Sequence, residues 1–239
     1  MTKLNILCLD IEGGHGGSSK SLFYSLKHID RDKINPIVIC KKPGLLIKYK
    51  DLGIECIVDS TMPTFTALRK QNRNILYYFL YLFVIWPKSK NFRKNLLNII
   101  EEKKIDIVHC NLISLYLLAK WLKKNKPKII MTLHVRTIPV NNYTAKYQAK
   151  ISNKIFDNKI FITENEKESM NNLLYPEKVK GDIIYNPVKL NVNSENYNSN
   201  KAINPIKIVS LSNYSYERGL DRIIDLASFI PEDKKKNFI

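Results

Sequence analysis

The sequence predicts an α/β fold with a Rossmann-like, open and mainly parallel sheet flanked by helices. Short apolar runs alternate with segments of helical periodicity along most of the chain. Two of these runs, residues 105–110 and 128–134, are nearly all apolar, which is typical of strands buried on both faces of a parallel sheet. A cluster of glycines follows the first run, at the point where this kind of sheet places a binding loop.

The first strand, loop and helix, within residues 4–22, form the most informative part of the chain. Residues 4–9 predict a buried strand, and Ser18 or Ser19 can cap the helix that follows the loop. Unpaired backbone N–H groups and the helix dipole would meet at one point, so we expect an anion-binding cradle, with a plain tight turn as the alternative. The loop holds four of the chain's eight glycines: Gly13, Gly14, Gly16 and Gly17.

The remaining elements follow from the same alternation, which predicts parallel strands joined by helices. Further strands are expected at residues 36–40, 55–58, 105–110, 128–134, 159–163 and 182–185. Helices are expected at about residues 18–29, 44–52, 66–103, 112–125, 143–157 and 164–174.

The pattern predicts one large domain followed by part of another. Residues 1–189 hold the alternating elements, and the Asn- and Ser-rich residues 190–204 indicate a linker. Residues 205–239 then contain a single β–α unit, which is too small to bury a core alone. We expect the start of an incomplete second domain, or a unit that packs back on the first domain.

The charge balance favours an anionic partner but does not identify one. The chain has 39 Lys and Arg against 22 Asp and Glu, a formal net charge of +17. The lysines are dispersed rather than striped, so a compositional bias is the competing explanation. The motifs disfavour nucleic-acid binding, because the sequence has no helix-turn-helix signature, RNA-binding aromatic motif or paired-cysteine zinc spacing.

The cysteines and the N-terminus predict a protein of a reducing compartment. No cysteine pair has metal-ligand spacing, and each cysteine lies in or beside an apolar run, which favours buried free thiols. Polar Asn5 and Asp10 interrupt the opening apolar run, so no signal peptide is predicted. The expected location is cytoplasmic. The cysteines are Cys8, Cys40, Cys56 and Cys110.

The longest apolar run, residues 75–86, predicts a helix that is too short to cross a bilayer. Twelve helical residues rise about 18 Å, whereas the hydrocarbon core is about 30 Å thick. Cationic residues flank this aromatic run on both sides, which suits a helix at an anionic membrane surface. We therefore expect peripheral membrane contact through residues 69–94, with a buried core helix as the alternative.

The glycine loop departs from two common phosphate-binding motifs. A P-loop needs a last glycine where Ser19 stands, and no later strand ends in a magnesium-binding Asp. A dinucleotide-binding loop needs a third glycine and an acidic residue after the second strand. The second strand instead ends in Lys41 and Lys42, which leaves NADP binding open because these cations could face a 2′-phosphate.

Six ordered landmarks point to a third possibility, a sugar-transfer fold. They are Gly13-Gly14-His15-Gly16-Gly17-Ser18, Asp106-Ile107-Val108-His109-Cys110-Asn111, Met131-Thr132-Leu133-His134, Ile162-Thr163-Glu164, Ile183-Ile184-Tyr185-Asn186-Pro187-Val188 and Glu217-Arg218-Gly219-Leu220-Asp221. In this order and spacing, the chain resembles the N-terminal, acceptor-binding half of the retaining glycosyltransferase family 4, which has the GT-B fold. The last landmark resembles the start of that family's C-terminal donor domain.

The resemblance implies a retaining, hexosyl-type glycosyltransferase of polysaccharide or glycolipid biosynthesis. Such an enzyme moves a sugar from a nucleotide-sugar donor to a glycan or lipid-linked acceptor, with no metal or other cofactor implied. His134 would be the catalytic residue that contacts the transferred sugar, and no general base is assigned. The substrate-binding residues expected on this interpretation are Gly16, Gly17, Ser18, His109, Arg136, Glu164, Asn186 and Arg218. Arg136 is included for its position just after His134, where it could meet an anionic acceptor, with an ordinary solvated arginine as the alternative.

Several of these residues also have an ordinary structural explanation. His109 could be a core histidine, Asn186 could form a turn before Pro187, and Glu164 could cap the helix at residues 164–174. The sequence also ends before the family's donor motif of two glutamates. The chain alone is therefore expected to be inactive, with a donor domain supplied by a downstream segment, or to be a non-catalytic acceptor- or membrane-binding half-enzyme.

Overall fold

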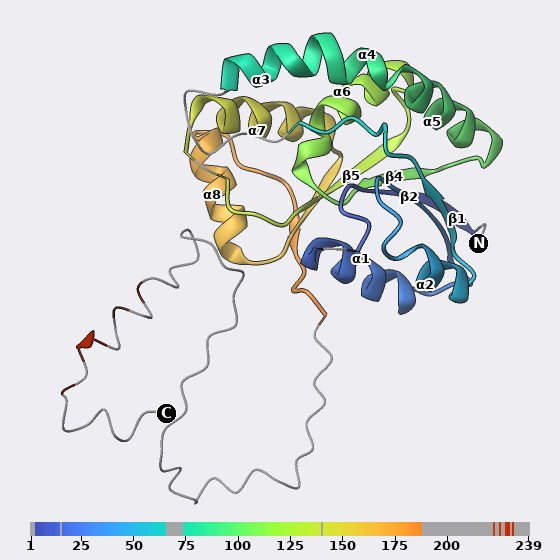
Figure 1. Cartoon of the computed structure of the whole chain (residues 1–239), viewed down its shortest axis with the longest axis horizontal. Helices are drawn as coiled ribbons and strands as arrows, with labels where there is room; N and C mark the ends of the chain where they lie inside the picture. Colours follow the sequence, from blue (N-terminus) through green and yellow to red (C-terminus); the bar gives the residue numbers. More distant parts are fainter. Residues whose placement is uncertain are drawn as a thin grey trace, which may run out of the picture. The chain divides into compact units, whose positions relative to one another are not determined.

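The computed structural model describes residues 3–14, 16–65, 74–139 and 141–187, with five isolated residues nearer the C-terminus (Figure 1). The chain divides into two units, Met1–Val188 and Lys189–Ile239. The predicted linker, Arg218 and most of the predicted β–α unit fall among residues of the second unit that are not described, so those predictions stay untested. The architecture that follows is that of the first unit.

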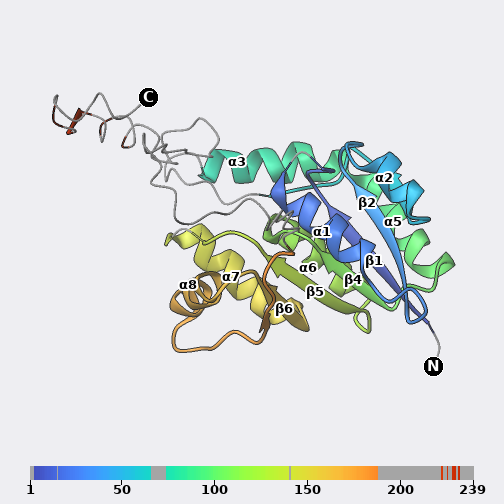
Figure 2. The same cartoon turned by 90° about the horizontal axis from the view of Figure 1, so that it is seen from below.

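The first unit is built on an open sheet of seven parallel strands, which confirms the predicted fold class. The strand order is β3-β2-β1-β4-β5-β6-β7. Figure 2 shows the neighbouring strands β2, β1, β4, β5 and β6 in this order. Most observed strand ends lie within two residues of the expected ones. The strands are β1 (Leu4–Asp10), β2 (Ile34–Cys40), β3 (Glu55–Val58), β4 (Ile107–Cys110), β5 (Ile130–Val135), β6 (Asn158–Phe161) and β7 (Asp182–Ile183).

Helices cover the two faces of the sheet unequally. Helices α1 and α2 lie on one face, and α5, α6 and α7 lie on the other (Figure 1). The helices are α1 (Gly17–Lys27), α2 (Leu46–Asp51), α3 (Asn74–Leu80), α4 (Trp86–Lys88), α5 (Lys90–Glu102), α6 (Tyr116–Asn125), α7 (Tyr143–Ile155) and α8 (Glu164–Leu174), with a 3₁₀ turn at Ile113–Leu115 before α6.

The alternation of side chains along the strands creates a separate core on each face. Leu7 and Leu9 of β1 join the larger core, which contains α5, α6, α7 and α8. Cys8 of the same strand faces the smaller core under α1 and α2. All four cysteines are free, as predicted; three are buried and Cys56 is half-buried.

The α1 side of the sheet is covered only in part. Helices α1 and α2 pack on β1 and β2, whereas Ile107, Thr132 and Ile160 on this side of β4, β5 and β6 remain half-buried. Ile130 and Ile184 are exposed. Parallel sheets are usually covered on both faces, so this open half leaves a hollow beside α1 in the first unit.

The expected single helix over residues 66–103 is wrong within the described residues, which begin at 74. Helix α3 runs into a π-helical turn at Tyr81–Ile85, and the chain breaks again at Ser89 before α5 begins. Pro87 has no N–H to donate, and the N–H of Trp86 reaches back five residues to Tyr81. Within the described part of the chain, every helix is too short or too polar to pass through a bilayer.

The glycine loop has a backbone that only glycine adopts without strain. Gly13 and Gly14 have φ angles of +59° and +112°. A β-carbon built on Gly13 would lie 1.9 Å from the carbonyl oxygen of Lys42, in the loop after β2. The loop therefore packs tightly against the neighbouring chain, whereas Gly17, the first residue of α1, has no heavy atom within 4 Å of such a carbon.

This contrast predicts different costs for two Gly→Ala substitutions. We expect Gly13→Ala to lower the free energy of unfolding by about 2 kcal/mol or more, because it adds left-handed strain and a backbone clash. Gly17→Ala is the matched control and is expected to change stability by less than about 1 kcal/mol. Urea denaturation of the full chain measures both, and equal effects would contradict the described loop.

Candidate functional site

A network of polar side chains joins the carboxyl ends of β1 and β4. Asp10 ends β1 and is fully buried, and its carboxylate accepts hydrogen bonds from Asn111 Nδ2 (3.1 Å) and the backbone N–H of Gly13 (3.2 Å). Asn111 follows β4 and also donates to the backbone oxygen of Ser18 in α1 (3.3 Å). These contacts tie the glycine loop and the start of α1 to the centre of the sheet edge.

Arg136 extends this network from the end of β5. Its Nε donates to Asn111 Oδ1 and its Nη1 donates to Asn186 Oδ1, each at 2.9 Å. Its Nη2 lies 2.9 Å from His134 Nδ1. Asn186 also accepts a hydrogen bond from Ser21 Oγ of α1 (2.7 Å). The network therefore brings together His134, Arg136 and Asn186, three of the residues predicted for the site.

His134 is the buried end of this arrangement. It belongs to β5, is 8% exposed, and its Nε2 has no hydrogen-bond partner among the described residues. Burial, Arg136 and His109 lower the pKa of His134 to about 2, so the ring is neutral. Burial also lowers the pKa of Arg136, to about 10, and Asp10 opposes that shift. The site thus has a neutral histidine beside a positive guanidinium.

His109 lies next to His134 in the middle of the sheet. The two ring centroids are 5.9 Å apart at 75°, and His109 Nδ1 lies 2.9 Å from Thr132 Oγ1. Burial and Arg136 lower the pKa of His109 to about 4. His109 was predicted either to bind substrate or to be an ordinary core histidine. It lies beside His134 and is also buried and within hydrogen-bond distance of Thr132, so each interpretation describes part of its environment.

A hollow of about 410 Å³ opens beside these histidines on the α1 side of the sheet. Aliphatic side chains from α1 and from strands β1, β4 and β6 form most of its lining, and the polar groups gather toward Arg136. Within the described residues, the glycine loop does not line this hollow, and the start of α1 is joined to His134 through Asn111 and Arg136. The hollow is lined by Ile6, Cys8, Leu22, Ser25, Leu26, Ile29, Ile107, His109, Thr132, His134, Arg136, Ile160 and Ile184.

The expected anion cradle at the glycine loop already faces a carboxylate of the chain. Ser18 Oγ donates to Glu12 Oε2 (2.5 Å), and a β-carbon on Gly16 would lie 1.7 Å from the same oxygen. Gly16 caps α1 and Gly17 is its first residue, so Glu12 lies where a helix N-terminus attracts negative charge. A phosphate at this position would have to displace the Glu12 side chain.

Sequence reasoning missed three members of the network, Asp10, Asn111 and Ser21, and it proposed Glu164, which lies apart from it. Asp10 and Asn111 were not predicted, although each is the polar residue that ends or follows an apolar strand. Glu164 is exposed in the first turn of α8, where the hydroxyl of Thr163 caps the helix. Within the described residues, no group of His, Cys, Asp or Glu is arranged to hold a metal ion.

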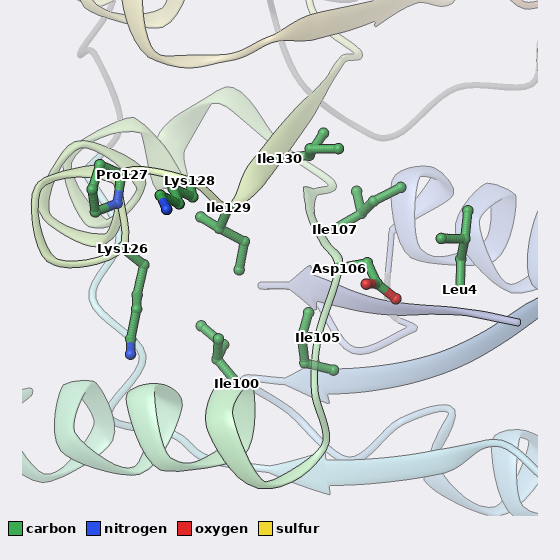
Figure 3. Close-up of a pocket in the computed structure, with 10 residues that line it drawn as sticks. All are labelled: Leu4, Ile100, Ile105, Asp106, Ile107, Lys126, Pro127, Lys128, Ile129 and Ile130. Carbon is green, nitrogen blue, oxygen red and sulfur yellow. The ribbon is translucent and has the colours of Figure 1, made fainter. Parts of the chain in front are cut away.

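A larger hollow of about 620 Å³ lies at the opposite edge of the sheet, near the amino ends of β1, β4 and β5 (Figure 3). Its walls are mainly aliphatic, including Leu4, Ile107 and Ile130 (Figure 3). Ligands of open α/β sheets bind at the carboxyl ends of the strands. The edge that holds Arg136 and His134 is therefore the candidate site.

The two buried histidines predict a loss of stability in mild acid. The folded ring of His109 binds a proton only near pH 4, whereas an unfolded histidine binds one near pH 6.5. The stabilising contribution is therefore complete above about pH 6.5 and is lost as the pH falls toward 4. From pH 7 to pH 5 we expect His109 to account for about 2 kcal/mol of lost stability.

Urea denaturation at several pH values measures this effect. The variant His109→Gln should lack that part of the pH dependence, and His28→Gln, at an exposed position after α1, is the control. Parallel pH profiles for the native chain and His109→Gln would contradict the prediction.

Comparison with solved structures agrees with the fold at low sequence identity. MurG from Acinetobacter baumannii is 13% identical with a TM-score of 0.52, and the match covers 94% of this chain and 57% of MurG. The apo form of WaaB, described as a lipopolysaccharide outer core galactosyltransferase, is 16% identical with a TM-score of 0.50; the match covers 77% of this chain and 46% of WaaB. The chain spans about half the length of these solved structures.

The family is identified by sequence. No curated protein matches the chain closely enough to report. The model of Glycosyltransferase Family 4 matches residues 15–192, which is most of the chain. Because this match agrees with a sheet that corresponds to half of a GT-B enzyme, the chain belongs to glycosyltransferase family 4, a family of retaining transferases.

Proposed function

We propose that the first unit is the acceptor-binding half of an enzyme that moves a hexosyl group from a nucleotide-sugar donor to a glycan or lipid-linked acceptor. The observation that supports this most directly is the buried Nε2 of His134, which has no protein partner at the carboxyl edge of the sheet. Buried polar atoms are nearly always hydrogen-bonded, so this nitrogen is free to bond a group from outside the chain. A sugar hydroxyl or ring oxygen has suitable chemistry.

The charges at this edge suit a reaction in which a diphosphate departs. Negative charge develops on the leaving group, and preorganised cations and N–H dipoles stabilise it. Arg136 provides a positive charge at this edge, and the N-terminus of α1 would add to it once the Glu12 side chain is displaced. We assign no general base, because the buried histidines have low pKa values and are poor proton acceptors.

The donor side of the reaction is proposed to belong to a second domain that begins near residue 205. The chain spans 46% of WaaB and 57% of MurG, which leaves about half of a GT-B enzyme unmatched. Arg218 would face the donor diphosphate, by resemblance to the family. In this proposal residues 1–239 alone bind nucleotide weakly and do not transfer sugar. Membership of the family disfavours NADP or nucleic acid as the ligand.

A fusion enzyme tests the proposed function. The donor half of an active family 4 enzyme is joined after residue 188, and release of nucleoside diphosphate is followed with a glycan and glycolipid extract as acceptor. We expect turnover by the fusion, none by residues 1–239, and about a hundredfold loss in the fusion that carries His134→Ala, because the sugar loses its contact. A folded fusion that turns over equally well with and without His134 would contradict the proposal.

The second part of the proposal is peripheral binding to an anionic membrane. Phe79 and Phe83 are 51% and 72% exposed, and their rings stack with centroids 6.0 Å apart. The exposed cations Lys88, Lys90 and Lys94 follow on α4 and α5. An apolar strip beside lysines matches the chemistry of an anionic bilayer surface.

Trp86, which ends the same apolar run, contributes to the fold instead. The ring of Trp86 lies 4.0 Å from the Arg93 guanidinium carbon and packs against Trp121. Membrane contact is therefore proposed for the exposed side of α3 and the π-helical turn, and Trp86 is left out of it.

Vesicle flotation tests this contact. The double variant Phe79→Ser and Phe83→Ser should reduce binding to vesicles that contain anionic lipid about tenfold or more, because it removes two inserted rings. Ile47→Ser, at a site on α2 that is 73% exposed, is the matched control and should bind as the native chain does. Equal flotation of all three proteins would rule out this surface.

A further inference from the structure

Arg136 constrains the chemistry of its neighbour, because a guanidinium can only donate hydrogen bonds. Its Nε, Nη1 and Nη2 atoms each lie 2.9 Å from one neutral group: Asn111 Oδ1, Asn186 Oδ1 and His134 Nδ1. Arginine carries five N–H donors and no acceptor. His134 Nδ1 must therefore accept the third bond, and it carries no proton in this arrangement.

The two amide groups that hold Arg136 are themselves fixed in orientation. Asn111 Nδ2 donates to the Asp10 carboxylate, so its Oδ1 is the atom left to face Arg136. Asn186 Oδ1 accepts a second hydrogen bond from Ser21 Oγ. The Asn111 acceptor thus follows from an independent partner in β1, the Asn186 acceptor follows from the donor-only guanidinium itself, and the guanidinium is held with its Nη2 toward the ring.

The bond to Nδ1 determines where the single proton of a neutral imidazole lies. With Nδ1 as acceptor, the proton is on Nε2, and Nε2 is buried without a partner among the described residues. The charged or titratable groups nearest the ring are Arg136 and His109; a second proton would have to enter beside the Arg136 cation. The ring is thus a neutral N–H donor that lacks an acceptor.

We propose that Arg136 is a positioning residue, which fixes the tautomer and orientation of His134 so that its Nε2–H is presented to an oxygen atom of the ligand. The hydrogen-bond geometry sets this tautomer whatever the ligand is. The identity of that oxygen, a hydroxyl of the transferred sugar, rests on the proposed function. This role differs from direct binding of the diphosphate, because Arg136 would affect the ligand through the tautomer and orientation of the His134 ring.

Nitrogen NMR of the histidine rings tests the proposal on the full chain without any substrate. Long-range ¹H–¹⁵N correlation at pH 7 distinguishes the two neutral tautomers and the cation, and the His134 signals are assigned by their loss in His134→Gln. We expect native His134 to have its proton on Nε2 and none on Nδ1. A proton on Nδ1, or a cationic ring at pH 7, would overturn the proposal from the native protein alone.

The variant Arg136→Met then tests the cause. It keeps a side chain of similar length but has no donor, so the His134 signals should shift from one tautomer toward an average of both. Arg136→Lys restores one cationic donor and should recover part of the native pattern. Arg31→Met is the control, since Arg31 lies toward Gly53 in another part of the fold, and it should leave the signals unchanged. An unaltered tautomer in Arg136→Met would also overturn the proposal.

The NMR result and the proposed function can fail separately. A native Nε2–H tautomer that depends on Arg136 supports the positioning role even if the fusion enzyme does not need His134. Turnover that needs His134, together with a proton on Nδ1, would keep the sugar-transfer proposal and reject the role of Arg136.

Discussion

The site depends on one half-buried cation whose hydrogen-bond partners are all neutral groups. Arg136 donates to Asn111 and Asn186 and reaches His134, so a single side chain links the ends of β4, β5 and β7. Burying a charge without a bonded carboxylate is costly, and burial lowers the pKa of this guanidinium. The buried Asp10 carboxylate offsets part of that cost through Asn111. The result is a sheet edge that, among the described residues, presents one guanidinium and one unsatisfied N–H donor.

The uneven covering of the sheet explains how this edge becomes accessible. Helices α1 and α2 cover β1 and β2, and the α1 side of β4, β5 and β6 opens into the hollow that His109 and His134 line. The other face is filled by the larger core, which includes α5, α6, α7 and α8. One face of the sheet therefore provides stability, while the half-covered face leaves room for a ligand beside polar groups.

The sequence predicts the sheet well because apolar runs and turns are local signals. The long helix was wrong because Pro87 and Ser89 interrupt it, an effect that an apolar pattern does not reveal. His134 and Arg136 could be predicted from a motif at a strand end, but their partners could not. Asn111 meets Asp10 across 101 residues of sequence, and such a hydrogen bond depends on strand order. The position of the Glu12 carboxylate at α1 depends on side-chain geometry in the same way.

The central claim is that the carboxyl edge of this sheet is one wall of a sugar-transfer site. A crystal structure of the fusion enzyme with a bound nucleotide sugar measures it most directly. The account predicts the Nε2 atom of His134 at about 3 Å from an oxygen of the sugar, with Arg136 still bonded to Nδ1. A sugar bound elsewhere, with His134 still buried and without a partner, would contradict the account.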